Sequence, residues 1–548
     1  MKSAAKLGSL LSLGMLTAAL SGAPAAFAQT APAPPPPPSA RSSAAGAGSG
    51  SQKPAITPAE ARELMRSVDS IMQFASADSQ LPIRHKVKRR LISREEVTRY
   101  VVAKFNDDED AKRMQRSEIV LKKFGLLDRD FQLRPFLTSL LTEQIAGYYD
   151  DKTKTVNLLD WIEPDAQRPV LAHELTHALQ DQRVDLSKWG NKTDTNLARN
   201  VIEDNRHLAA DEADSARDAV LEGQAMAVFV DYTLKASGRS LLTAPEMVEG
   251  LKDNMEDVSD SPVMARAPLL LQQSMLFPYR EGLSFEAALL KDSGAAGAFA
   301  AALDRPPSTS YEILNPPAYE RQEKIPLLTM PDIHDLLRTA YDPYDVGVMG
   351  ALDVRMLTEL FAGPDVSAQL TPQWDGGLYY AAQARSAQAN GQRASTASLS
   401  LLYLSRWKTP EAADRFARIY AEELSKKYSR VSRDNASEAD DSEQIYNTSE
   451  GPVLIAVSGR QVFVSESFDM PLARKLQLLL TGAQSSEGLQ TASLAIGPAF
   501  AAGAAPSGTP RLRVSKMSPL PAPASDPLTG SMVRWLSSCG FMKAALPR

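Results

Sequence analysis

The segment His173-Glu174-Leu175-Thr176-His177 constrains the fold of this chain more than any other stretch. Residues four positions apart point the same way on an α-helix, so the two imidazoles can face one point in space. Neutral imidazole is a common zinc ligand, and a carboxylate between the histidines can take a proton from metal-bound water. The spacing predicts a helix with His173 and His177 as metal ligands and Glu174 as general base.

The residues around the motif favour a helix. Pro169 fits the first turn of a helix that starts there. Leu171, Leu175 and Leu179 provide an apolar face that can pack against the rest of the domain. The chain has 5 histidines in 548 residues, so we favour a metal site over a helix that carries two histidines by chance.

A zinc site of this kind needs a third protein ligand and leaves a fourth position to water. The pattern predicts a long helix over Asp211–Ala236, with Glu222 on its apolar row. A carboxylate in an apolar setting is costly unless a cation compensates its charge, so Glu222 is our preferred third ligand. Gly223 would let this helix approach the histidine helix closely. An exposed glutamate on a polar face is the alternative, and the other possible ligands are His207, Glu203, Asp218 and Glu212.

These residues resemble the gluzincin class of zinc metallopeptidases, in which a glutamate on a downstream helix completes a HExxH site. The likeness extends from about Leu133 to about Tyr380, and within the class the chain is similar to exported bacterial proteins regarded as peptidases. The stretches that carry it are Gln144–Asp150, Leu171–Gln182, Leu221–Ala225 and Pro306–Pro316. The resemblance implies a zincin-like catalytic domain, one Zn²⁺ per chain and a peptide or protein substrate. The group would have histidine where Asn315 stands and an acidic residue where Gly377 stands.

Two alternating segments before the motif predict a β-hairpin. They are Gln144–Tyr149 and Lys154–Leu159, and the polar residues Asp150-Asp151-Lys152-Thr153 separate them. In gluzincins a strand at this place borders the cleft, where an extended peptide can pair with its edge. An ordinary hairpin that covers one side of the core is an equally good interpretation of the residues.

The predicted chemistry is peptide-bond hydrolysis by zinc-bound water, with Glu174 moving a proton to the leaving amine. Asp181 lies four residues after His177; it either orients an imidazole or is a solvated acid near the helix end. A further donor is normally needed for the tetrahedral oxyanion. The unranked candidates are Tyr148, Tyr149, His207, Tyr232, Arg280 and Tyr311.

Residues 1–28 have the pattern of a secretory signal peptide. Lys2 and Lys6 precede the apolar run from Leu7 to Leu20, and Ala26-Phe27-Ala28 provides a small-residue cleavage site. We therefore expect an exported protein, periplasmic or secreted after cleavage near Ala28. The run is too short for a convincing membrane span, and no later stretch has the length of a transmembrane helix.

Charge and cysteine content exclude some classes of partner and stabilising bond. The formal charge of −6 becomes −8 when the signal peptide, with two lysines and no acids, is removed, and this disfavours nucleic acid as a partner. Cys539 is the single cysteine, so no disulfide can form within the chain. The residues do not indicate an oligomeric state.

Composition and periodicity divide the rest of the chain, whose expected fold class is α+β. Residues 29–56 are rich in Pro, Ala, Ser and Gly and should form a disordered linker. Residues 57–330 are predicted to form the mainly α-helical catalytic domain with its small hairpin. Residues 331–482 should form a smaller α+β domain with a docking or structural role, and residues 483–548 a disordered tail.

Several local predictions can be compared directly with the structure. In the first domain we expect a helix that starts at Pro58, a solvated charged face over Arg84–Arg90, and helices over Pro268–Leu276 and Ser284–Leu290. In the second domain we expect a helix over Val346–Phe361 and then two similar strand-strand-helix units. The segments of these units are Leu378–Ala384, Ser395–Trp407, Pro410–Tyr428, Gln444–Tyr446, Val453–Ser458, Gln461–Ser465 and Pro471–Leu480.

Two other functions use the same residues. A zinc hydrolase that acts on a non-peptide amide or ester would need the same site. An exported zinc-binding scaffold or chaperone-like protein would keep a structural or vestigial site, although a structural metal has no need of a base such as Glu174. The sequence favours a metallopeptidase, and it indicates neither its cleavage specificity nor whether it acts as an endopeptidase or an exopeptidase.

Overall fold

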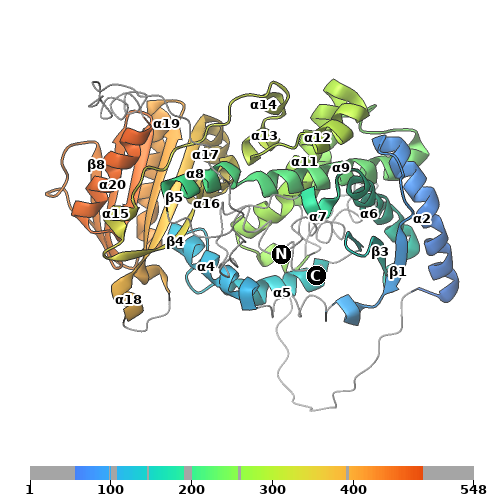
Figure 1. Cartoon of the computed structure of the whole chain (residues 1–548), viewed down its shortest axis with the longest axis horizontal. Coiled ribbons are helices and arrows are strands. Elements are labelled where there is room, and N and C mark those ends of the chain that lie inside the picture. Colours follow the sequence, from blue (N-terminus) through green and yellow to red (C-terminus); the bar gives the residue numbers. More distant parts are fainter. Residues whose placement is uncertain are drawn as a thin grey trace, which may run out of the picture.

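The computed structural model places helices at one end of the molecule and a large β-sheet at the other, along its longest axis (Figure 1). The described residues are 56–97, 99, 108–144, 147–189, 200–256, 261–389 and 394–484. The predicted signal peptide and nearly all of the predicted linker and tail lie outside these residues. None of the described helices has the length and apolar character needed to span a membrane.

The first helix, α2 (Pro58–Ser79), begins where the sequence predicts. The Glu60 amide donates to the Thr57 hydroxyl, and the Thr57 amide donates to the Glu60 carboxylate, so a capping box satisfies two amides at the helix start. The other helices of this half are α4 (Asp108–Phe124), α5 (Leu133–Gln144), α6 (Pro164–Val184), α7 (Leu186–Trp189), α8 (Val201–Ala210), α9 (Ala213–Leu234), α10 (Met247–Glu256), α11 (Leu269–Ala295), α12 (Ala302–Asp304), α13 (Ser310–Leu314) and α14 (Pro316–Glu320).

The predicted hairpin is confirmed, since β2 (Tyr148–Asp150) and β3 (Thr155–Leu159) pair antiparallel, but the predicted start of its first strand is wrong, because Gln144 is the last residue of α5. A third strand, β1 (Lys88–Ile92), pairs parallel with β3, which gives the order β1-β3-β2. Strand β1 was not predicted, because the charges of Arg84–Arg90 indicate only a solvated face. One charged side chain of this strand contacts α2. Arg89 donates to the Met65 carbonyl at 2.6 Å and forms an ion pair with Asp69.

The HExxH motif lies on α6, as predicted, but the predicted start of that helix is wrong. Pro164 occupies the first turn, and Pro169 lies inside the helix. The earlier start is held by Gln167, whose side chain donates to the Leu159 carbonyl at 2.8 Å and accepts from the Leu159 amide at 3.1 Å. These two bonds attach the start of α6 to the end of β3.

The glutamate helix is also confirmed, as α9, which packs against both α6 and α11. A β-carbon on Gly223 would lie 2.2 Å from the carbonyl oxygen of Gly282, and one on Gly282 would lie 2.2 Å from that of Ala219. Glycine therefore lets α9 approach α11 closely. The prediction that Gly223 allows a close approach to the histidine helix was wrong.

The sequence analysis predicted two short helices where the structure has the single helix α11. Pro278 lies inside α11 and removes one main-chain hydrogen bond. Its neighbours Phe277 and Tyr279 are almost fully buried, so packing holds the helix continuous through the proline. Here the packing of neighbouring residues outweighs the tendency of proline to end a helix.

The second half contains a seven-stranded antiparallel sheet with the order β4-β5-β6-β10-β9-β8-β7 among the described residues. Its strands are β4 (Tyr341–Val348), β5 (Trp374–Ala384), β6 (Leu399–Trp407), β7 (Val431–Arg433), β8 (Glu443–Thr448), β9 (Gly451–Ser458) and β10 (Gln461–Glu466). Its helices are α15 (His334–Leu337), α16 (Ala351–Ala362), α17 (Pro364–Leu370), α18 (Arg385–Ala389), α19 (Pro410–Lys427) and α20 (Met470–Ala483). The chain is thus α+β, as predicted.

The two predicted strand-strand-helix units form one sheet because β6 pairs with β10. Alternate residues of β6 face opposite sides. Leu401 and Tyr403 belong to the core that includes residues of α19, whereas Leu402 and Leu404 belong to the core that includes residues of α20. The two helices therefore cover opposite faces of the sheet.

The helix predicted over Val346–Phe361 starts too early. Val346 and Val348 lie in strand β4, and α16 begins only after Gly350. The Gly350 amide donates to the side chain of Asp353 at 2.9 Å, which marks the true start of the helix. The β-branched residues before this cap favour a strand.

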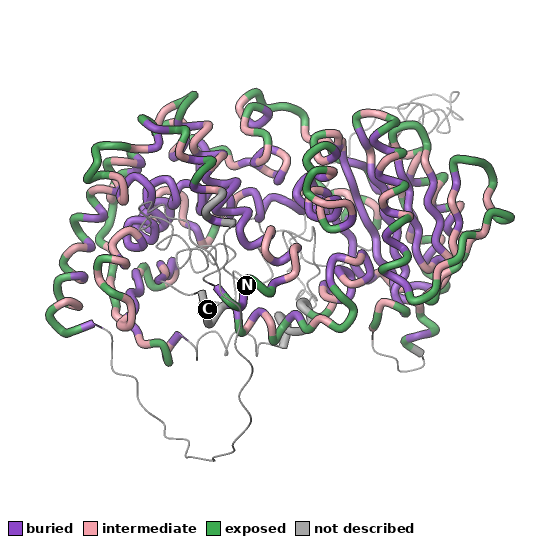
Figure 2. Tube along the Cα trace, turned by 180° about the vertical axis from the view of Figure 1, so that it is seen from behind, coloured by how far each residue is buried: buried purple, intermediate pink, exposed green. Residues whose placement is uncertain are grey.

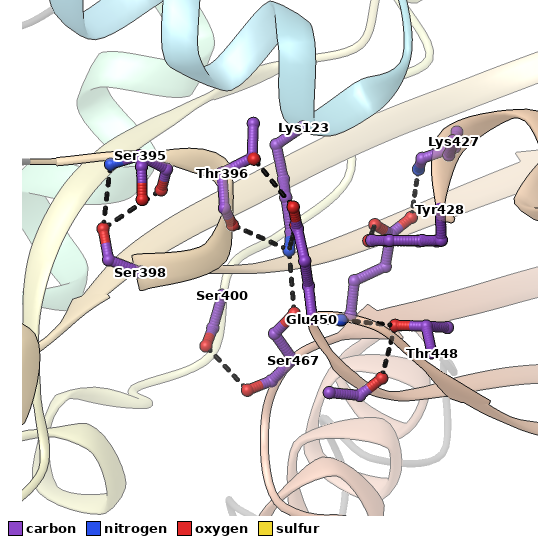
Figure 3. A network of polar contacts seen from close by, with 12 residues as sticks. Lys123, Ser395, Thr396, Ser398, Ser400, Lys427, Tyr428, Thr448, Glu450 and Ser467 are labelled. Atoms are coloured by element: carbon purple, nitrogen blue, oxygen red, sulfur yellow. Dashed lines mark hydrogen bonds and ion pairs between the residues drawn. The ribbon is translucent and has the colours of Figure 1, made fainter. Parts of the chain in front are cut away.

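Buried residues continue from the helical half into the strands of the large sheet (Figure 2). At this junction Phe124, at the end of α4, packs edge-on against Tyr379 and Tyr403 of the sheet. Lys123 is fully buried beside it and donates to the Thr396 carbonyl at 3.0 Å, to the Ser467 hydroxyl at 2.7 Å and to Glu450 at 3.1 Å (Figure 3). Apolar and charged contacts therefore join residues on both sides of the predicted boundary near residue 330, and the division into separately folding domains stays a prediction.

The close crossing of α9 and α11 leads to a first test. Replacing Gly223 with alanine should lower the free energy of unfolding by about 1–3 kcal/mol, the usual cost of overpacking a core. Gly250→Ala in α10 is the matched control, because no described atom lies within 4 Å of the added β-carbon. The control should be neutral or more stable by about 0.5–1 kcal/mol. Urea unfolding measures both, and a Gly223→Ala protein as stable as the wild type would contradict the crossing.

Candidate metal centre

α6 and α9 bring the two histidines and the glutamate together. His173 Nε2 lies 3.2 Å from His177 Nε2 and 3.2 Å from Glu222 Oε2, and His177 Nε2 lies 3.5 Å from the same oxygen. All three side chains are buried. Within the described part of the chain, these residues are the one group whose ligand atoms lie close enough together to share a metal ion.

The distances fit a tetrahedral zinc site. Zinc lies about 2.0–2.2 Å from imidazole nitrogen and carboxylate oxygen, so two of its ligand atoms at the tetrahedral angle stand roughly 3.3–3.5 Å apart. Two imidazoles and one carboxylate also leave a fourth position for water or substrate, as catalytic zinc sites require. His173, His177 and Glu222 therefore fit one zinc ion in both geometry and ligand chemistry.

The charge of Glu222 is compensated inside the protein. Burial alone would raise the pKa of Glu222, but His177 and His173 outweigh burial and bring it to about 2. Burial lowers the pKa of His173, whereas at His177 the effect of burial is outweighed by Glu222 and the pKa is raised. The site keeps an ionised carboxylate away from water, and a metal cation would stabilise that carboxylate further.

Two glutamines fix the tautomer of His177. Gln224 donates from its amide nitrogen to two main-chain carbonyls at 3.1 and 3.0 Å, so its oxygen is left to accept. Gln180 donates to that oxygen at 2.9 Å and to the Leu221 carbonyl at 3.0 Å. The oxygen of Gln180 lies 2.8 Å from Nδ1 of His177 and must accept its proton, so Nδ1 is fixed as a donor and Nε2 is the nitrogen that a metal ion would bind once it has lost its own proton.

The sequence analysis did not assign this role to either glutamine. Gln180 follows His177 by three positions and shares its helix face, which is a usable signal. Gln224 is two residues from Glu222, and only the packing of α9 against α6 brings it to Gln180. The hydrogen bond between Gln180 and Gln224 therefore depends on tertiary structure.

Glu174, the predicted general base, is held by the small sheet. One carboxylate oxygen accepts a hydrogen bond from the Tyr149 amide at 2.8 Å, and the side chain is buried. Glu174 also raises the pKa of His177, so it acts electrostatically on the metal group. Tyr149 belongs to β2, an edge strand of the described sheet, whose main chain therefore positions this carboxylate.

Asp181 has neither of its predicted roles. Its carboxylate accepts hydrogen bonds from the Tyr149 hydroxyl at 2.8 Å, the Lys154 ammonium at 2.6 Å and the Leu186 amide at 3.0 Å. It is 4% exposed, so it is not a solvated acid. Because these donors occupy it, Asp181 ties the end of α6 to the hairpin rather than orienting an imidazole.

The other possible ligands lie outside the metal group, which among the described residues contains none of His207, Glu203, Asp218 and Glu212. His207 Nε2 is 3.6 Å from Asp211 on the following turn. Glu212 accepts a hydrogen bond from the Ser310 hydroxyl, and burial raises its pKa to about 7. Both residues belong to the junction with α13 and β4 instead.

The candidate oxyanion donors are dispersed. The Tyr149 hydroxyl is bound to Asp181, and Tyr232 packs edge-on against Phe74 at 5.1 Å between ring centroids. Arg280 and Tyr311 line a groove described below. Tyr279, which the sequence analysis did not select, stacks on His173 with centroids 6.4 Å apart and planes 19° apart. Tyr279 is therefore added to the residues that border the metal centre.

The two positions that depart from the resembled group lie in other elements. Asn315 follows α13 and donates to the Tyr311 carbonyl at 2.8 Å. Gly377 lies in β5, where a β-carbon would stand 2.7 Å from the Met349 carbonyl oxygen. The strand as packed here has no space for an acidic side chain at this position.

Comparison with known proteins does not identify a relative. No protein-family model matches the chain, and searches of curated proteins and of solved structures find no significant match. The interpretation of the centre therefore depends on its own residues and geometry.

Removing the tautomer control should weaken metal binding. In Gln180→Leu the Nδ1 proton of His177 loses its acceptor, so zinc affinity should fall by about 10–100-fold, the usual effect of losing such a partner. Gln182→Leu is the matched control, because Gln182 lies on the same helix but contacts Arg84 and His85 instead of the metal group, and it should keep the zinc affinity of the wild type. Competition with a chromophoric chelator measures both affinities, and equal zinc affinity in Gln180→Leu and the wild type would contradict the role of Gln180.

Proposed function

We propose that this chain is an exported zinc metallopeptidase of the gluzincin type, with a zincin-like helical domain, that hydrolyses peptide bonds. The triangle formed by His173, His177 and Glu222, with sides of 3.2–3.5 Å, is the observation that carries this proposal. The carboxylate oxygen and the two imidazole nitrogens lie close enough together to bind one metal ion.

The roles of the residues follow from their positions. A zinc ion bound here would supply Lewis acidity to a scissile carbonyl and would make bound water more acidic. Glu174 accepts the proton of the attacking water and delivers it to the leaving amine. The Tyr149 amide orients Glu174, and Gln180 with Gln224 holds Nδ1 of His177 as a donor, so that Nε2 is the nitrogen available to a metal ion.

The position of β2 favours a peptide over another amide or ester. Tyr149 lies opposite Val156 in the β2–β3 pairing, yet its amide donates to Glu174, so this side of β2 faces the catalytic carboxylate. An extended peptide that lies along this side of β2 would have its main chain beside Glu174. A scaffold with a purely structural metal would need neither the base nor this arrangement.

Replacing Glu174 separates metal binding from catalysis. Glu174→Gln still accepts from the Tyr149 amide but lacks basicity, so zinc should remain at one per chain while hydrolysis falls by at least about 100-fold. Glu222→Ala should instead lose zinc. Metal analysis and cleavage of a peptide library measure the two effects on proteins purified in parallel.

The outcomes of this experiment are distinct. Undiminished hydrolysis by Glu174→Gln would overturn the proposed base. Stoichiometric zinc in Glu222→Ala would remove Glu222 from the site. Stoichiometric zinc without hydrolysis of any peptide in the library by the wild-type protein would count against the peptidase and favour the scaffold.

A further inference from the structure

A groove of about 680 Å³ lies between α11, α13, α16 and α17, away from the ligands of the metal centre. This volume is within the range of small-ligand sites, about 300–1,000 Å³. We call it the α11–α16 groove. Its walls combine the apolar side chains of Leu269, Leu276 and Leu314 with amide and hydroxyl groups.

Positive charge is in excess in the α11–α16 groove. The charged residues that line it are Arg280, Arg355, Lys408 and Glu359. Glu281 adds a second carboxylate, because its Oε1 pairs with Arg355 Nη1 at 2.7 Å. Three cations and two carboxylates leave one positive charge.

The pKa of Glu281 reflects the cations beside the groove. Burial alone would raise the pKa of Glu281, but Arg355, Lys252 and Arg280 outweigh burial and lower it. These three cations therefore keep Glu281 ionised, and the Glu281 carboxylate holds Arg355 in place. Arg355 also donates to Gln273 at 3.4 Å, so its guanidinium is held beside the groove wall.

The chemistry of the lining selects a type of ligand. A single excess positive charge matches a monoanion, and guanidinium groups bind carboxylates with two parallel hydrogen bonds. Gln273 and Asn315 can exchange hydrogen bonds with main-chain amides, and the leucines can cover an apolar side chain. A carboxylate next to amides and an apolar side chain is the chemistry of a peptide C-terminus.

We propose that the α11–α16 groove binds the free C-terminal carboxylate of a peptide whose last residue is apolar. Arg355 and Lys408 provide the charge, and the neighbouring amides and leucines provide the fit. The proposal goes beyond hydrolysis at the metal centre and does not require it. Both sites border α11: Tyr279 stacks on His173, and the next residue, Arg280, lines the groove.

The test uses the mature full-length chain with Glu174→Gln, so that hydrolysis cannot consume the probe. The probe is fluorescein-labelled Gly-Ala-Ala-Leu with a free C-terminus, compared with the same peptide as a C-terminal amide. Fluorescence anisotropy should show binding of the acid at least about tenfold tighter than the amide, a loss expected for one charge-assisted hydrogen bond.

Two variants locate the binding. Arg355→Gln and Lys408→Gln should each weaken binding of the acid by about tenfold or more. Lys408 is exposed, so its replacement leaves the core intact if Arg355→Gln disturbs the fold. Arg338→Gln on the end of α15 removes the same charge from an exposed site outside the groove and should have no effect.

Three results would overturn the proposal. Equal affinity for the acid and the amide would show that the carboxylate is not recognised. A preference for the acid that survives both groove variants would place the site elsewhere. Displacement of the peptide by inorganic phosphate at equal or lower concentration would indicate a general anion site. None of these results depends on whether the metal centre hydrolyses peptides.

Discussion

The buried negative charge of Glu222 is the constraint around which the helical half is arranged. An unpaired carboxylate in this position would be very costly, so the chain must supply polar side chains that contact it. α6 supplies His173 and His177, and the glycine contact between α9 and α11 fixes the helix that carries Glu222. The position of one charged residue thus links three helices and makes a metal ion a favourable occupant.

Local signals in the sequence predicted the parts of the fold that depend on local physics. The start of α2 at Pro58, the hairpin before α6 and the two strand-strand-helix units all follow from caps, turns and periodicity. Errors occurred where tertiary contacts decide the outcome. The helix predicted to end at Leu276 continues through Pro278 as α11. The charged residues of β1 did not indicate a strand, because it is the pairing with β3 that makes this segment a strand.

At the candidate metal centre, too, the features that depend on one helix were predicted and those that depend on contacts between helices were not. The metal-ligand triad and Glu174 could be selected from spacing and apolar context, since both are properties of single helices. The contact of Gln180 with Gln224, the stacking of Tyr279 on His173 and the true partner of Gly223 involve pairs of helices distant in sequence. Both predicted roles of Asp181 were wrong, because the sequence does not indicate that Tyr149 and Lys154 of the hairpin bind this carboxylate.

The central claim is that one zinc ion is bound by His173, His177 and Glu222. Anomalous diffraction at the zinc edge, from crystals of the zinc-loaded protein, tests it most directly. The account predicts one strong anomalous peak about 2.0–2.2 Å from Nε2 of each histidine and from one oxygen of Glu222. Absence of a peak at this position in fully loaded crystals, or a peak bound by other residues, would contradict it.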